Sequence, residues 1–147
     1  MIADFRDLLT AMNDAGVRFL VVGAHALAAH GVPRVTGDLD LWVEPTAANA
    51  GRVWRALAVF GAPLTSLDVD EADFARPDQV IQLGLAPFRI DILTSISGVD
   101  FSPAWTGRLG GTLFGVPVSF LGREAFIQNK RASGRPKDLD DLRSLGL

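Results

Sequence analysis

The feature that most restricts the possible fold of this sequence is a turn of small residues followed by two alternating aspartates. One short helix and one loop separate the turn from the aspartates. The turn, Val22-Gly23-Ala24, follows an apolar run of strand-forming residues, and the aspartates open a second apolar run, Asp38–Val43. Strand side chains alternate between two faces, so Asp38 and Asp40 should point one way and the neighbouring leucines the other. The pattern predicts a strand, a tight turn, a helix and a second strand, which is an α/β arrangement.

Two carboxylates on one face of a strand predict a cation site. At ~3.3 Å rise per residue, the Cα atoms of Asp38 and Asp40 should lie roughly 7 Å apart. That spacing lets their oxygens converge on divalent cations, which lie ~4 Å apart in two-metal sites. Without a cation, parallel carboxylates so close together repel.

A third acid, Asp91, occupies one face of another apolar run, between Ile90 and Ile92. A charge in such a place is costly unless it is paired or bound to a metal. A solvated face or a salt bridge is the simpler interpretation of any single strand aspartate, but three acids on two apolar strands favour a shared site. We therefore predict Asp38, Asp40 and Asp91 as metal ligands and catalytic residues, with Mg²⁺ or Mn²⁺ as the cofactor.

Composition limits the class of protein. The 147 residues are enough for one ordinary domain, and 48% hydrophobic with 21% charged residues indicates a globular chain. The net charge of −3 argues against a large nucleic-acid-binding face. No apolar run approaches the ~20 residues of a membrane span. Cysteine is absent and acids stand near the N-terminus where a signal peptide would be basic, so we expect a cytoplasmic protein without disulfides.

Periodicity and turn residues predict the remaining elements. Helices are expected over residues 2–15, 24–30, 46–60, 123–132 and 136–145, and strands over 18–22, 38–43, 80–85 and 88–94. Ala86-Pro87 should link the last two strands, a polar stretch over 65–78 reads as a long excursion, and a hairpin around Gly115 should join 112–114 to 117–121. The fold class expected is α/β (α+β): a single domain, residues 1–147, with a mixed, antiparallel-edged sheet flanked by helices.

These motifs carry a family resemblance. Gly23-Ala24, Asp38-Leu-Asp40 and Asp91 resemble the polymerase-β-type nucleotidyltransferase superfamily, whose pattern is a strand, Gly-Gly or Gly-Ser, a helix, an acid-x-acid strand and a third acid. More narrowly, the run from Val22 to Gly31 and the tail Asn129–Asp138 are similar to small bacterial nucleotidyltransferase-like proteins related to the abortive-infection toxin group. The resemblance covers most of the chain and implies a minimal nucleotidyltransferase fold, a nucleoside triphosphate substrate and magnesium.

The resemblance also implies a nucleotide-binding set, namely Gly23, Ala24, Arg34, Thr36 and Lys130. Glycine at the turn lets the first amides of the following helix approach phosphate oxygens. Ala24 departs from the usual second glycine or serine, so a hydroxyl is missing there. Arg34, Lys130, Arg135 and Lys137 are candidates for neutralising phosphate, with Lys130 ranked above Arg34, and Lys137 is expected to pair with Asp138 instead.

The function expected is transfer of a nucleoside monophosphate group from a triphosphate to an acceptor hydroxyl, with release of pyrophosphate. The acceptor stays open between a small molecule, an RNA end and a protein side chain, as does the choice between a homo-oligomer and a partner protein. The alternative, favoured by Ala24, is a weak or inactive relative that binds nucleotide or a partner. A two-metal phosphohydrolase is disfavoured because the sequence lacks the His-Asp clusters that such an enzyme needs. His25 and His30 do not share one face of a helix well.

Overall fold

The computed structural model describes residues 2–85 and 88–147. Its strands are β1 (Phe19–Val22), β2 (Asp38–Val43), β3 (Val80–Leu85), β4 (Phe88–Leu93), β5 (Leu109–Leu113) and β6 (Val116–Phe120). Its helices are α1 (Ile2–Asp14), α2 (Gly23–Ala29), α3 (Ala47–Phe60), α4 (Phe101–Thr106), α5 (Arg123–Ser133) and α6 (Pro136–Ser144), with a 3₁₀ helix, η1, at Glu71–Ala75.

The strands form one mixed sheet in the order β3-β4-β2-β1-β6-β5. The central strand β2 is antiparallel to β1 and parallel to β4, and β1 is parallel to β6. Both edge strands, β3 and β5, pair antiparallel with their neighbours. The α+β class and the mixed sheet with antiparallel edges are therefore confirmed.

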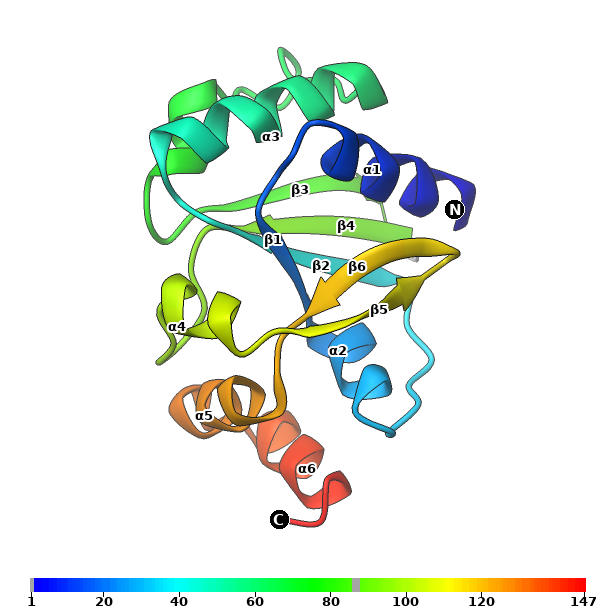
Figure 1. Ribbon diagram of the computed structural model, residues 1–147, viewed down its shortest axis with the longest axis vertical. Helices are drawn as coiled ribbons and strands as arrows, with labels where there is room; N and C mark the ends of the chain where they lie inside the picture. Colours follow the sequence, from blue (N-terminus) through cyan, green and yellow to red (C-terminus); the bar gives the residue numbers. More distant parts are fainter. Residues whose placement is uncertain (1, 86–87) are drawn as a thin grey trace.

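Helices cover both faces of this sheet (Figure 1). Helices α1 and α3 lie on one face, and α2, α4 and α5 lie on the other, with α6 beyond α5 at the C-terminal end. Alternate residues of β1 supply the two cores: Phe19 and Val21 face the first, Leu20 and Val22 the second. A strand buried on both sides reads as an unbroken apolar run, which is the pattern β1 shows in the sequence.

The predicted limits of α3 are confirmed in detail. The Thr46 hydroxyl accepts a hydrogen bond from the Asn49 amide at 3.2 Å, and Gly61 ends the helix in the left-handed conformation at φ 88°. Its buried side chains include Ala50, Val53 and Leu57, the stripe that the helical spacing predicts.

One buried side chain that the sequence did not single out joins α3 to the sheet. Asn49 is 0% exposed, and its Oδ1 accepts from the Arg18 amide at 2.8 Å. Its Nδ2 donates to the carbonyls of Arg18 and Glu44 at 3.0 and 2.9 Å. These bonds satisfy backbone groups just before β1 and just after β2, so Asn49 fixes the start of one strand beside the end of the other.

Three differences from the predicted elements have physical reasons. Helix α4 was not predicted because it spans six residues and contains Pro103, which breaks a helical pattern. Strand β5 begins three residues earlier than expected because pairing with β6 orders Gly110 and Gly111, which have low strand propensity. The polar stretch over 65–78, predicted as a long excursion, contains the helix η1, which the buried side chain of Phe74 holds against the core.

The Ala86-Pro87 link lies outside the described residues. Within them, no helix is both long and apolar enough to cross a membrane.

Candidate functional site

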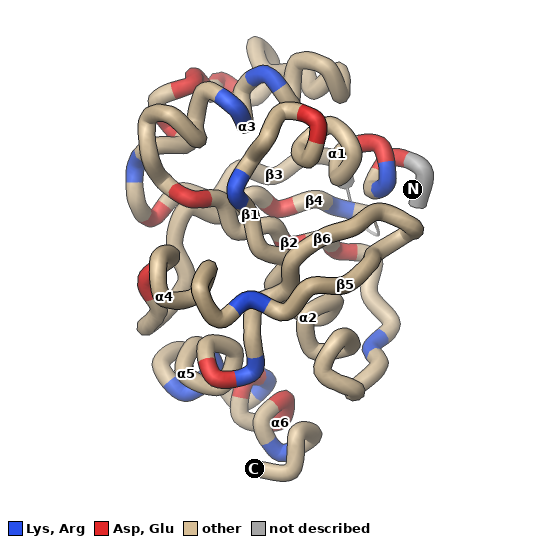
Figure 2. The backbone as a smooth tube through the Cα atoms, viewed as in Figure 1, with Lys and Arg blue, Asp and Glu red and all other residues tan. Residues whose placement is uncertain are grey.

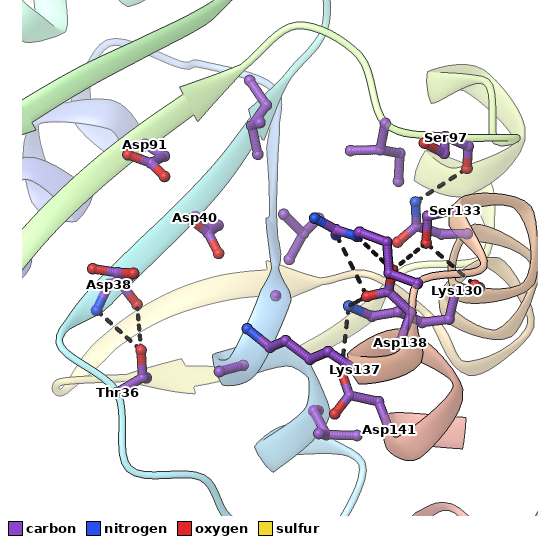
Figure 3. A pocket seen from close by; sticks show the side chains of 18 of the residues that line it. Thr36, Asp38, Asp40, Asp91, Ser97, Lys130, Ser133, Lys137, Asp138 and Asp141 are labelled. Carbon is purple, nitrogen blue, oxygen red and sulfur yellow. Dashed lines mark hydrogen bonds and ion pairs between the residues drawn. The ribbon is translucent and has the colours of Figure 1, made fainter. Parts of the chain in front are cut away.

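The three predicted acids converge on neighbouring strands (Figure 3). Asp38 and Asp40 lie on β2, and Asp91 lies on β4 directly opposite Asp40 in a parallel pairing. Adjacent strands lie ~4.8 Å apart, so the two facing residues are close neighbours. Leu39 and Leu41 are 0% exposed in the core on the other face of β2. The predicted alternation along β2 is confirmed.

Gly23 brings the turn after β1 directly against Asp40. Val22 pairs with Asp40 across the β1–β2 ladder, so the next residue, Gly23, lies over that carboxylate. A Cβ at Gly23 would stand 2.3 Å from Asp40 Oδ2, and Gly23 has φ +69°, a conformation that L side chains rarely adopt. Glycine is therefore required here both by backbone conformation and by the space that Asp40 occupies.

Asp40 is electrostatically unsatisfied. Burial raises the pKa of its carboxyl to about 6, and the nearby Asp91 and Asp38 add to the increase, while Arg89 and Lys137 oppose it. Across residues 2–85 and 88–147, no group donates a hydrogen bond to this carboxylate. A cation held between the acids would offset both the burial and the repulsion that raise this pKa.

Arg89 lies among the three carboxylates, and the sequence interpretation missed it. Its Nε and Nη2 donate to the two oxygens of Asp91 at 2.9 and 3.1 Å, and Nη2 lies 3.6 Å from Asp38 Oδ2. Arg89 also pairs with Asp38 across the β2–β4 ladder. A usable signal was present, because residues two apart on a strand share a face and Arg89 precedes Asp91 by two.

The side chains available as metal ligands indicate which kind of cofactor suits this site. In the described part of the chain, no group of three or more His, Cys, Asp or Glu side chains is arranged to hold a metal ion. Both oxygens of Asp91 face Arg89. Carboxylate oxygens are nevertheless the ligands that Mg²⁺ and Mn²⁺ prefer. Asp38 and Asp40 supply such oxygens on one face of β2, whereas the oxygens of Asp91 are bound by Arg89.

A polar cleft of about 640 Å³ surrounds these acids and collects the other predicted residues. It is lined by all five members of the predicted nucleotide-binding set, namely Gly23, Ala24, Arg34, Thr36 and Lys130. Sequence positions more than 100 residues apart therefore face one space. Their contacts with a nucleotide stay predictions.

Thr36 positions the acidic strand within this cleft. Its Oγ1 accepts a hydrogen bond from the Asp38 amide at 3.0 Å, just where β2 begins. The bond fixes the backbone of the first acid.

An ion-pair network joins α5, α6 and the loop before β2. The Asp138 carboxylate is 0% exposed and lies 3.2 Å from Lys130 Nζ, 2.6 Å from Ser133 Oγ and 2.8 Å from Arg135 Nε. Burial alone would raise the pKa of Asp138, but hydrogen bonds from these three groups outweigh it and hold the pKa well below its usual range. Asp138 is thus a buried anion with its hydrogen bonds satisfied.

Asp141 extends this network toward β2. Its oxygens lie 3.4 Å from Lys130 Nζ and 3.0 Å from Arg34 Nη2. Figure 2 shows acidic and basic residues side by side where α5 and α6 meet. Among the described residues no ion pair joins Lys137 to Asp138, so the local pair expected from the sequence is not made.

The two histidines have separate surroundings. Burial lowers the pKa of His25, offset in part by a hydrogen bond with the Asp38 backbone, and its ring stands edge-on to Phe114. His30 Nε2 lies 2.8 Å from the carbonyl oxygen of Leu121. Neither ring is part of a metal-binding group in the described residues.

Neither a scan of protein-family models nor a search of curated proteins found a match to this sequence. The geometry of the cleft therefore carries the functional argument.

Substitution Gly23→Ala should destabilise the protein more than Gly16→Ala. Both glycines are left-handed, at φ +69° and +70°, but a Cβ at Gly16 meets nothing within 4 Å. The control should lose about 1 kcal/mol from backbone strain, and Gly23→Ala should lose about 2 kcal/mol more because Asp40 must move. Urea denaturation measures both, and equal losses would contradict the close packing of Gly23 on Asp40.

Substitution Asp40→Asn should stabilise the metal-free protein in a pH-dependent way. The folded pKa of Asp40 is about 6, above its ordinary value of ~3.9, so wild-type stability falls as pH rises between these values. The amide removes this loss, so the variant should exceed wild type by about 1–3 kcal/mol at pH 8 and match it near pH 4. Urea denaturation in a chelator tests this, with Asp68→Asn, outside the cleft, as the control. A variant no more stable than wild type at pH 8 would show that Asp40 is satisfied.

Proposed function

We propose that this chain is a metal-dependent nucleotidyltransferase that moves a nucleoside monophosphate group from a nucleoside triphosphate to an acceptor hydroxyl. The observation that carries the proposal is the pairing of Asp40 with Asp91 on parallel strands, with the Gly23 turn against Asp40. This places concentrated negative charge beside the half-buried backbone of a turn in a polar cleft. A cation with an anionic substrate suits such a place better than an apolar ligand does.

Different residues of the cleft have different roles in the proposed reaction. Asp38 and Asp40, with Asp91 as the third donor, would hold Mg²⁺ or Mn²⁺, which supplies charge neutralisation at the phosphates and lowers the pKa of the acceptor hydroxyl. Gly23 leaves room for the Asp40 carboxylate beside the turn where α2 begins, and the backbone amides of that turn would contact the triphosphate. Basic side chains along the cleft offset the negative charge of the substrate.

The proposed reaction is an in-line displacement. The acceptor oxygen forms a bond to the α-phosphorus, and the bond from that phosphorus to the oxygen bridging to the β-phosphate breaks. Pyrophosphate leaves with the electron pair of the broken bond. The acceptor's proton goes to Asp91, whose release from Arg89 exposes a basic oxygen.

A second candidate function has specific support. Both oxygens of Asp91 are bound by Arg89, and Ala24 lacks the hydroxyl common in the superfamily that the sequence resembles. A domain that binds nucleotide or a partner without turnover suits these two features.

A triphosphate substrate also fits the cytoplasmic location expected from the sequence.

Magnesium together with a triphosphate should raise the melting temperature, because the ligands relieve repulsion among the three acids. At ligand concentrations ~100 times Kd, the gain of about 2.7 kcal/mol corresponds to a shift of roughly 5–10 °C for a chain of this size. A thermal-shift panel of the four common triphosphates, with Mg²⁺, Mn²⁺ or chelator, measures it. If no triphosphate gives a metal-dependent shift, both the enzyme and the nucleotide-binding module are excluded.

Turnover separates the enzyme from the binding module. Pyrophosphate release, with cell extract as the acceptor source, should fall at least 100-fold in Asp38→Asn, Asp40→Asn and Asp91→Asn. Asp68→Asn, at an exposed position outside the cleft, is the matched control and should keep wild-type activity. Ala24→Ser should preserve or increase the rate of an enzyme. Metal-dependent binding without release in wild type and Ala24→Ser would instead establish the module.

A further inference from the structure

The basic residues of the cleft are not equally available to a substrate. Arg89, which lines the cleft, is already paired with Asp91 and Asp38. The other basic residues of the lining are Arg34, Lys130, Arg135 and Lys137. Lys130 Nζ lies within 3.2 and 3.4 Å of Asp138 and Asp141, and its side chain is 11% exposed. Arg34 and Arg135 each donate to one of the same two carboxylates at 3.0 and 2.8 Å. These three cations already have protein anions as partners.

Lys137 differs from the other three. It is exposed, and in residues 2–85 and 88–147 its ammonium has no hydrogen-bond or ion-pair partner. Figure 3 shows its side chain extending away from Asp138, toward the part of the cleft where Asp40 lies. The charge of Lys137 also acts on Asp40, where it opposes the increase in the carboxyl pKa.

The network explains why Lys137 faces the cleft. Lys137 follows Pro136 at the start of α6 and immediately precedes Asp138. Successive residues of a helix are separated by ~100° around its axis. Because Asp138 is held inside the network by Lys130, Ser133 and Arg135, the rotation of α6 is fixed and Lys137 is directed to the adjoining face.

We propose that Lys137 is the residue that binds the β- and γ-phosphates of the substrate, and later the leaving pyrophosphate, while Lys130 anchors α6. The inference rests on the proposed function only in taking a triphosphate as the substrate. An unpartnered ammonium at the mouth of a cleft suits phosphate, which lysine binds as a compact point charge. Lys130 would have to abandon two carboxylates to do the same, leaving buried anions without a partner.

The binding test compares four proteins with Mg²⁺ and a non-hydrolysable triphosphate by calorimetry: wild type, Lys137→Gln, Lys137→Arg and Arg131→Gln. Arg131 is an exposed α5 residue outside the cleft, and its substitution removes the same unit of charge. Lys137→Gln should weaken triphosphate binding about 10–100-fold, with Lys137→Arg recovering most of the loss and Arg131→Gln staying within about twofold. Affinity for the corresponding monophosphate should be nearly unchanged in Lys137→Gln, which a general structural defect would not produce.

Chemical labelling gives a second readout without substitution. Lys130 and Lys137 are the only two lysines in the sequence. Pyridoxal 5′-phosphate condenses with a lysine amine with loss of water, and borohydride reduces the imine to a stable secondary amine. Mass spectrometry should find the label on Lys137, and Mg²⁺ with the triphosphate should protect it.

The outcomes are distinguishable. If wild type binds the triphosphate and Lys137→Gln binds it equally well, or if Lys130 takes the protected label, the assignment to Lys137 is overturned while the proposed function stands. If wild type binds no triphosphate with Mg²⁺, the proposed function fails and the assignment fails with it.

Discussion

The partial burial of Asp40 beside two further carboxylates, fixed by strand pairing, is the constraint on which the rest of this site depends. The parallel pairing of β2 with β4 sets Asp40 opposite Asp91, and the alternation along β2 adds Asp38 on the same face. The antiparallel pairing with β1 then brings Gly23 over Asp40. A core-forming sheet thus concentrates negative charge at one place, which destabilises the metal-free fold and favours a cation there.

Two arrangements of basic side chains shape the charge around these acids. Arg89, on the same face of β4, donates to both oxygens of Asp91 and forms an ion pair with Asp38, so Asp40 alone of the three carboxylates has no ion pair among the described residues. Farther away, Asp138 and Asp141 bind three basic side chains and hold α6 against α5. The first arrangement leaves the Asp40 carboxylate without an ion pair, and the second sets the direction in which Lys137 points.

Much of the site could be predicted from local sequence patterns. Alternation on apolar runs correctly placed Asp38 and Asp40 on one face of β2, and the glycine turn correctly ended β1, because both depend on residues close in sequence. Strand order is not encoded locally, so the pairing of Asp40 with Asp91 became visible only in the sheet. The partners of Lys130 depend on how α5 packs on α6, which no single-helix pattern specifies. Arg89 was readable from its spacing to Asp91 and was overlooked because arginine is usually solvent-exposed.

The protonation of Asp40 tests the central claim most directly. A ¹³C NMR titration of the aspartate carboxyl carbons, with the Asp40 signal assigned by its loss in Asp40→Asn, follows this group alone. The account predicts a pKa of about 6 in the metal-free protein and a lower pKa when Mg²⁺ and a non-hydrolysable triphosphate bind. A metal-free pKa near the ordinary ~3.9, or a raised pKa that Mg²⁺ and the triphosphate leave unchanged, would contradict it.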